Sequence, residues 1–119
     1  MAQIRSYIAA SSANILNYIL SLPDNFKTRI GEGGSTLSSG QAQRIAIARA
    51  VYKEGLIFIF DEPTANLDTE NVEKIQSIIK NLSAEKICIV VTHDEDMMKL
   101  CGRLYVFENK QMTDISVSV

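Results

Sequence analysis

The fold class of this chain of 119 residues follows from residues 56–63, which are Leu56-Ile57-Phe58-Ile59-Phe60-Asp61-Glu62-Pro63. The apolar run 56–60 has the pattern of a β-strand that is covered on both faces. Two carboxylates and a proline then end it abruptly. A second apolar run, residues 87–91, has a similar length and ends at Thr92 and His93. Two such runs predict neighbouring strands of a sheet that is buried rather than half exposed.

An amphipathic helix is predicted between these two strands. Asp68 is a good N-cap residue, and the apolar residues that follow it recur at helical spacing. Strands that alternate with helices, and that carry continuous apolar runs, are typical of parallel sheets. The chain is therefore predicted to be an α/β protein with a parallel sheet flanked by helices. The apolar face of the helix consists of Val72, Ile75, Ile78, Ile79 and Leu82.

The segments before the first strand are predicted from local patterns. Residues 13–20 have helical spacing, with Ser12 as the N-cap and Pro23 just beyond the end. Residues 31–36 are rich in glycine and serine and are expected to form a loop. Residues 41–52 then resume a helical pattern that is rich in alanine and isoleucine, and Gly55 breaks it.

The segments after the second strand are shorter. Asp94 is expected to cap a short helix. Residues 103–112 have the pattern of a strand, a turn and a further strand. The last residues, 113–119, are expected to be frayed.

Composition and charge exclude several functional classes. Hydrophobic residues make up 46% of the chain, and 12 basic and 14 acidic side chains give a net charge of −2. The chain is therefore globular rather than disordered, and it has no basic stripe of the kind that binds nucleic acid. No apolar run is long enough to span a bilayer. Cys88 and Cys101 form no metal-binding pair, which predicts a cytosolic chain that reaches a membrane only through a partner.

Polar residues at the ends of the two strands are candidates for chemistry, because ligands of parallel sheets gather at the carboxyl ends of the strands. Asp61 can hold Mg²⁺ through its hydration shell, and Glu62 can orient or deprotonate a water molecule. The same residues can equally be a polar end of a strand followed by a turn. His93 alone is more typical of a surface or capping residue than of a catalytic one.

The stretch Ser38-Ser39-Gly40-Gln41 opens a helix and also allows two interpretations. Backbone N–H groups and a hydroxyl at a helix N-terminus can bind an anion. The commoner meaning of such a stretch is an ordinary N-cap formed by serine.

The combination of these stretches closely resembles the ATP-binding domain of ABC transporters. Leu37-Ser38-Ser39-Gly40-Gln41, with the helix that follows, resembles the ABC signature, and residues 56–62 resemble the Walker B strand. Ala65-Asn66-Leu67-Asp68 resembles the D-loop, and Val91-Thr92-His93 resembles the switch-histidine segment. The four motifs occur in the family's order and at close to its spacing, over roughly residues 12–112.

The resemblance implies an ATPase with ATP and Mg²⁺ at its site. In this family two ATPase domains meet head to tail, and Ser38, Gly40 and Gln41 would contact nucleotide held by the opposite domain. By the same resemblance the first half of the chain, about residues 1–50, is part of the helical subdomain with the signature helix. Residues 51–119 then form the nucleotide-binding core from Walker B onward, which makes the fold a partial P-loop NTPase fold.

The resemblance also implies roles for individual residues. Asp61 would support Mg²⁺, Glu62 would polarise the attacking water, and His93 would contact the γ-phosphate. Asp68 would couple the two ATP sites across the dimer. Transmembrane domains would be the other partner, which places the chain at the cytoplasmic face of a membrane. Export is favoured over import by the stretch before the signature, Leu22-Pro23, Thr28 and Gly31-Glu32-Gly33-Gly34.

Two departures from the family's pattern stand out. Ser39 replaces the usual first glycine of the signature, which costs little if its φ stays below zero. The Walker A pattern, Gly-x-x-x-x-Gly-Lys-Ser/Thr, does not occur in these 119 residues, because none of the lysines follows a glycine. We therefore expect a partial domain that is inactive alone and that exposes unpaired apolar strand edges.

Two alternatives to an exporter ATPase remain, and the first belongs to a different functional class. The chain can be a catalytically silent interaction module that presents its signature face to a complete partner domain. It can also be an ABC ATPase of DNA repair or chromosome architecture. The second alternative predicts coiled-coil heptads or a basic surface, and the sequence has neither.

Overall fold

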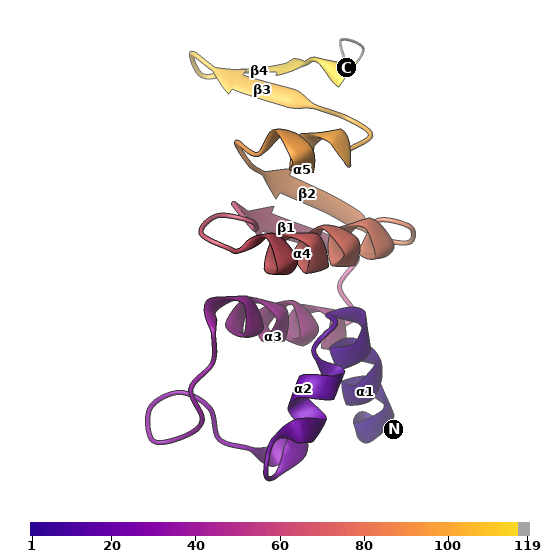
Figure 1. Ribbon diagram of the computed structural model, residues 1–119. Coiled ribbons are helices and arrows are strands. Elements are labelled where there is room, and N and C mark those ends of the chain that lie inside the picture. Colours follow the sequence, from indigo (N-terminus) through magenta and orange to yellow (C-terminus); the bar gives the residue numbers. More distant parts are fainter. Residues whose placement is uncertain (117–119) are drawn as a thin grey trace.

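The helices and strands stack in layers along one long axis, in nearly the order in which they occur in the chain (Figure 1). The computed structural model describes residues 1–116. The molecule measures 49 × 30 × 25 Å and its radius of gyration is 16.0 Å, whereas a compact domain of this length has a radius of gyration of about 13.5 Å. The chain is therefore elongated, with helices at its N-terminal end and a β-hairpin at its C-terminal end.

A parallel β–α–β unit forms the middle of the molecule. Strand β1 (Ile57–Asp61) leads through helix α4 (Thr69–Leu82) to strand β2 (Ile87–Val91). The two strands pair in parallel along their whole length, from Ile57 opposite Ile87 to Asp61 opposite Val91. Both strands, the helix between them and its N-cap, Asp68, are as the sequence predicts. This confirms the α/β class with a parallel sheet.

The hydrophobic core lies between one face of this sheet and the helices. Phe58 and Phe60 point inward from β1, and Ile75 and Ile78 on α4 are at most 2% exposed. Helix α3 (Ser39–Tyr52) packs against the same core through Ile47. The remaining fully or nearly fully buried members are Ala10, Ala13, Ile15, Ile19, Ile79 and Met97.

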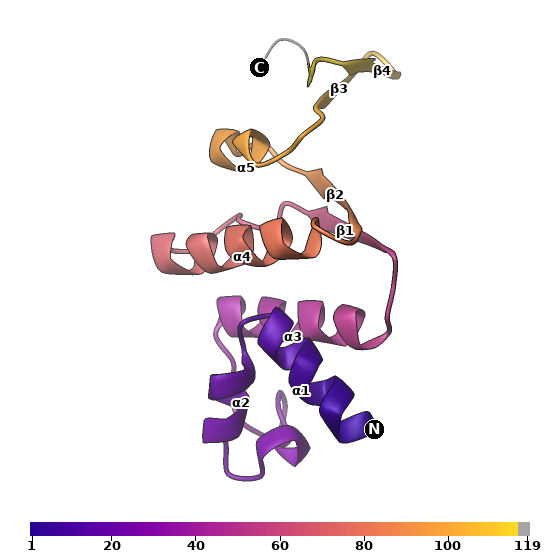
Figure 2. The same ribbon diagram turned by 90° about the vertical axis from the view of Figure 1, so that its right-hand side faces the viewer.

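The opposite face of the sheet is open, which corrects the prediction that both strands are covered on both faces. Burial alternates along β1, with Phe58 and Phe60 buried and their neighbours exposed. Figure 2 shows helices on only one side of the two strands. A continuous apolar run therefore lies in a half-exposed strand. The exposed apolar side chains are Leu56, Ile57, Ile59, Ile87, Ile89 and Val91.

The N-terminal helices differ from the prediction of one helix over residues 13–20. Helix α1 (Ala2–Ser12) ends at Ser12, so Ser12 is its last residue and not an N-cap. Asn14 adopts a left-handed φ of 52°, and the N–H of Ile15 donates to the carbonyl of Ala10. This is the hydrogen-bond pattern that closes a helix C-terminus, and asparagine tolerates it better than most residues. Helix α2 (Leu16–Ser21) then starts separately.

Two short helical elements follow α2 and β2. A 3₁₀ turn, η1 (Asn25–Lys27), follows α2, and helix α5 (Glu95–Lys99) follows β2. Asp94 is the N-cap of α5, as predicted, and accepts the N–H groups of Asp96 and Met97. Among residues 1–116, no helix combines the length and the apolar character needed to cross a membrane.

A β-hairpin of β3 (Tyr105–Glu108) and β4 (Gln111–Asp114) ends the described chain. The strand–turn–strand prediction is confirmed, but residues 113 and 114 belong to β4 and are not frayed. Residues 117–119, which belong to the same prediction, lie outside the described residues. Arg103 closes the open end of the hairpin by donating to Asp114 at 2.9 Å.

The acid dependence of this closure is testable. The pKa of Asp114 falls from 3.8 to about 2, because Ser116 donates hydrogen bonds to its carboxylate and Arg103 lies beside it. Since the folded state binds this proton less tightly than the unfolded state, the carboxylate stabilises the fold above about pH 3.8 and the stabilisation disappears as the pH falls through 2. We expect the carboxyl ¹³C resonance of Asp114 to titrate with a midpoint near 2. A midpoint at the ordinary value would contradict the described contacts.

Candidate active site

The segments that carry the candidate residues come to one side of the molecule. The carboxyl ends of β1 and β2 lie on the same side as the N-terminal ends of α3, α4 and α5 (Figure 1). Because β1 and β2 are parallel, their carboxyl ends are neighbours, and each helix that follows a strand begins on that side. The topology therefore brings residues 61–68 and 92–94 together.

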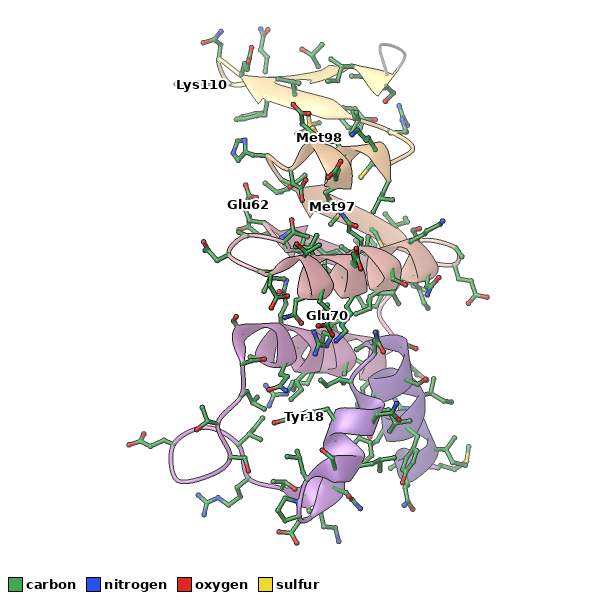
Figure 3. The ribbon with its side chains drawn as sticks, in the orientation of Figure 1. Tyr18, Glu62, Glu70, Met97, Met98 and Lys110 are labelled. Carbon is green, nitrogen blue, oxygen red and sulfur yellow. The ribbon has the colours of Figure 1, made fainter. Side chains whose placement is uncertain are left out.

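Glu62 and His93 are brought close to one another at these strand ends. The Oε1 atom of Glu62 lies 3.6 Å from Nε2 of His93. The imidazole is almost fully exposed and the glutamate side chain is 38% exposed, so both can be reached from solvent. Figure 3 shows Glu62 at the end of β1, on the side where α4 begins. In this arrangement the carboxylate can accept a hydrogen bond from a water molecule, and the neighbouring imidazole can donate one to a phosphate oxygen.

The backbone places Glu62 at a sharp change of direction. Its φ is 46°, a left-handed value that is uncommon for a residue other than glycine. Its N–H donates to the carbonyl of Val91 at 2.8 Å, which extends the pairing of the two strands by one bond. The chain then turns away from the sheet at Pro63.

Asp61 is the last residue of β1 and is exposed, on the same face of the sheet as Val91 opposite it. Within residues 1–116 no group of three or more histidine, cysteine, aspartate or glutamate side chains could hold a metal ion by itself. Mg²⁺ commonly needs only one or two protein carboxylates, since water and substrate phosphates supply its other ligands. Asp61 therefore fits a Mg²⁺ ion that arrives with a nucleotide.

The signature stretch forms the start of α3. Ser38 is the N-cap, its Oγ accepts the N–H of Gln41, and Oε1 of Gln41 accepts the N–H of Ser38. These reciprocal bonds are a capping box, so Ser38 caps α3. Ser39 begins the helix in helical geometry, and serine carries no left-handed strain there.

A contact between α3 and α4 explains why Gly40 has no side chain. A Cβ atom at Gly40 would lie 2.5 Å from Oδ1 of Asn71, which is too close. The same Oδ1 accepts a hydrogen bond of 2.6 Å from the guanidinium of Arg44. Sequence analysis missed Asn71, because its partners lie about thirty residues away in the chain. Arg44 could have been found, since it lies four residues after Gly40 and three before Ile47, on the buried face of α3.

Arg44 is 6% exposed, and its Nε is buried without a hydrogen-bond partner among the described residues. Burial lowers the pKa of the guanidinium, and the carboxylates of Glu70 and Asp68 oppose that change. Glu70 lies in the gap between α3 and α4 (Figure 3). The cation thus joins the signature helix to α4, near its N-terminus.

Asp68, at the D-loop position, has a structural role in this chain. Its Oδ1 accepts the N–H of Asn71 at 2.8 Å and so caps α4. A second link joins α3 to the segment after β1, where Nε2 of Gln43 donates to the carbonyl of Pro63. No hydrogen bond among residues 1–116 joins Ser38–Gln41 directly to Glu62 or His93. The signature helix is therefore linked to the other segments of the site through α4 and Pro63.

Two further residues at the strand ends were not identified as site residues from the sequence. The hydroxyl of Thr64 donates to Oδ2 of Asp94 at 2.8 Å. Thr64 is 9% exposed. No local pattern predicts this bond, because it depends on the register of β1 against β2. Asp94 was recognised only as a helix cap.

The two cysteines lie outside this group. Both are partly buried and unpaired within the described chain. Burial raises the pKa of the Cys88 thiol, and Cys101 nearby adds to that effect. Burial also raises the pKa of Cys101. Both thiols therefore stay protonated at neutral pH.

A parallel sheet whose strands end in Asp-Glu and in histidine, next to a capped helix that carries the signature, defines a nucleotide-binding α/β domain. The family described as "ABC transporter" matches residues 6–65. The chain belongs to the ABC transporter family, and its fold is part of that family's P-loop NTPase fold. The predicted resemblance to the ATP-binding domain of exporter-type members is confirmed.

Several relatives align with most of this chain. A "Probable ABC transporter ATP-binding/permease protein" of Haemophilus influenzae is 42% identical over 105 residues, which are 88% of this chain and 19% of the relative. An "ATP-dependent lipid A-core flippase" of Saccharophagus degradans is 40% identical over 89% of this chain and 18% of its own length. "Multidrug resistance protein pgp-1" of Caenorhabditis elegans is 45% identical over 78% of this chain and 7% of its own length. The chain thus spans less than a fifth of these relatives.

Proposed function

We propose that this chain carries the hydrolytic half of the ATPase domain of an ABC exporter. The observation that carries the proposal is the approach of Glu62 to His93, at 3.6 Å, on the carboxyl ends of two parallel strands. In this proposal about residues 1–50 form part of the helical subdomain with the signature helix. Residues 51–119 form the nucleotide-binding core from the Walker B strand to its C-terminal part.

The proposed chemistry is hydrolysis of the terminal phosphate of ATP. Glu62 polarises the attacking water and His93 contacts the γ-phosphate, so both act on the same end of the nucleotide. Asp61 supports Mg²⁺, which neutralises negative charge on the phosphates when it is bound. Because phosphoryl transfer needs charge stabilisation and positioning more than covalent chemistry, these few groups suffice on the side of the attacking water.

The proposed partners are a second ATPase domain and the transmembrane domains of a transporter. Ser38, Ser39, Gly40 and Gln41 face nucleotide held by the second domain, and Asp68 couples the two ATP sites. The N–H groups at the N-terminus of α3 support this role, since they favour a phosphate group. Relatives named as a flippase and a multidrug resistance protein support export, with this chain at the cytoplasmic face of the membrane.

Hydrolysis also requires a phosphate-binding loop with a lysine, and these 119 residues contain no Gly-x-x-x-x-Gly-Lys-Ser/Thr stretch. We therefore propose that the chain acts only together with a segment that supplies such a loop. The same observation favours one alternative, a silent module that offers its signature face to a complete partner domain. In both cases the chain alone is inactive.

The test measures hydrolysis of Mg·ATP by the chain alone, and by the chain mixed with a separately made segment that carries a Walker A loop from a homologous domain. We expect no activity above background from either component and measurable activity from the mixture. Co-sedimentation of the two components shows whether they associate.

Two results would overturn the proposal in different ways. Hydrolysis by the chain alone that depends on Glu62 would show that it has its own phosphate site. Association without any hydrolysis would support the silent module instead.

A further inference from the structure

Glu62 and His93 are held on one side by the ends of the strands. Asp61 is the last residue of β1 that pairs with β2, and the N–H of Glu62 adds one further bond to Val91. Beyond this bond the segments that follow β1 and β2 separate, because Glu62 turns away from β2 in its left-handed conformation. Strand pairing alone therefore fixes the backbone before Glu62 and before His93, but not after them.

A side-chain bond closes the other side. The hydroxyl of Thr64, two residues after Glu62, donates to Oδ2 of Asp94, the residue directly after His93. Thr64 and its neighbour Pro63 are both buried. The bond between Thr64 and Asp94 is thus protected on the threonine side, while the Glu62 and His93 side chains face solvent.

Asp94 is itself fixed in place, so that it can serve as an anchor. Its Oδ1 accepts the N–H groups of Asp96 and Met97 at the start of α5. Met97 is 0% exposed and belongs to the hydrophobic core. In Figure 3 Met97 lies below α5, toward β2 and α4. The carboxylate therefore connects Thr64 to an element that is anchored in the core.

The turn around His93 is fixed by a third bond. The N–H of Asp94 donates to Oγ1 of Thr92 at 2.9 Å, so the residues on both sides of His93 are joined to each other. The pKa of Asp94 is lowered, mainly by the hydrogen bond from Thr64, so the carboxylate remains ionised at neutral pH. A hydrogen bond to an ionised acceptor is stronger than one between neutral groups.

We propose that Thr64 and Asp94 are positioning residues, and that their hydrogen bond holds Glu62 and His93 at the separation needed to act on one phosphate group. Neither residue contacts the reacting atoms in this proposal. A positioning role requires the hydroxyl of Thr64, whereas a packing role requires only a side chain of the same shape. This inference rests on the proposed ATPase function for its catalytic meaning, but the geometric part stands without it.

The first test uses the chain alone, because His93 is its sole histidine and gives one imidazole signal. At fixed pH, Glu62→Gln is expected to shift the ε1 C–H resonance of His93, since the two side chains are 3.6 Å apart. Thr64→Val keeps the shape and removes the hydroxyl, and should reduce this response by more than half. Thr64→Ser keeps the hydroxyl and should retain it.

The controls separate positioning from loss of fold. Amide spectra and thermal unfolding show whether each variant is folded, and Thr64→Ala replaces Thr64→Val if valine does not fit. A folded Thr64→Val chain whose His93 signal responds to Glu62→Gln as fully as in the parent chain would overturn the proposal. A loss of response in Thr64→Ser as well would assign the effect to packing and would also overturn it.

The second test measures hydrolysis in the mixture described under the proposed function. Thr64→Val should lower kcat by about 10-fold to 100-fold while KM for ATP stays within about 2-fold, because misplacement by about 1 Å costs rate more than binding. Thr64→Ser should recover most of the rate. If the mixture is inactive, the proposed function fails and the His93 signals still decide the positioning role. A Thr64→Val mixture with the parent kcat would reject that role.

Discussion

Replacing Ile75 by alanine is expected to lower the free energy of unfolding by about 2–5 kcal/mol. Ile75 is 0% exposed and lies on the face of α4 that packs against the core. Its removal takes apolar surface out of the core and leaves a cavity that the neighbouring helices and strands only partly fill. Denaturant unfolding, followed by circular dichroism in the helical region, gives this free energy directly. An effect of this size is a large share of the stability of a small domain.

Ile59→Ala is the matched control for this prediction. The residue type and the substitution are the same, but Ile59 is 72% exposed on the open face of β1. We expect its free energy of unfolding to change by no more than about 0.5 kcal/mol. If both variants lose the same stability, the open face must be covered in solution, for example by another copy of the chain. Sedimentation velocity on the parent chain distinguishes that case.

Glu62→Gln is expected to lower kcat of the mixed ATPase by about 10²-fold to 10⁴-fold, the range for loss of a general base. Glutamine has nearly the same shape but cannot take a proton from the attacking water. It also removes the carboxylate that lies 3.6 Å from His93. ATP binding should remain, because Glu62 acts on the water and not on the nucleotide. Steady-state hydrolysis and equilibrium binding of a fluorescent ATP analogue measure the two effects separately.

Glu85→Gln serves as the control for the charge change. Glu85 is exposed in the turn between α4 and β2, at the opposite end of the strands from Glu62 (Figure 1). The substitution removes one carboxylate and leaves the strand ends unchanged. The kcat of the mixed ATPase should therefore stay within about 2-fold of the parent value, as for other distant surface changes. Equal rates for the parent and Glu62→Gln would remove Glu62 from the proposed chemistry.

The middle of the fold could be predicted because its signals are local. The apolar runs of β1 and β2 and the spacing of Ile75, Ile78 and Ile79 each identify an element without knowledge of its neighbours. The caps at Asp68 and Asp94 are local signals as well, since each side chain bonds to N–H groups within three residues.

The break between α1 and α2 could not be predicted from periodicity, because the apolar spacing continues across it. Asn14 ends α1 in a left-handed conformation, and asparagine is only one of several residues that allow this. Asn14 is nevertheless a signal for this break, since a helix terminus that buries Ile15 needs such a residue. The signal can be interpreted only after a helix has been recognised in residues 2–12.

The open face of the sheet has a different cause. Ile57 and Ile59 are as apolar as Phe58 and Phe60, so the sequence indicates a cover for both faces. In residues 1–116 the sheet containing β1 has two strands, and helices pack on one of its faces. The apolar residues along a strand indicate that both of its faces are suited to burial. They do not indicate which segment packs on each face.

The candidate site was predictable in part. The strand-end positions of Asp61, Glu62 and His93 follow from the parallel arrangement, and the resemblance to ABC proteins assigns their roles. The bonds from Thr64 to Asp94 and from Arg44 to Asn71 join segments about thirty residues apart. Such pairs depend on the register of one strand against another and on the packing of one helix on another. A single sequence contains neither directly.

The stacking of the layers in chain order has a consequence for how the protein is made. A ribosome releases the chain from the N-terminus, at about 5–20 residues per second. Helices α1, α2 and α3 emerge before β1 and lie together at one end of the molecule (Figure 1). Each later element then adds mainly to a surface that already exists, and the β3–β4 hairpin is added after α5. The exposed isoleucines of β1 emerge before β2. At these rates the edge of β1 that pairs with β2 therefore remains unpaired for about 2–6 seconds during synthesis.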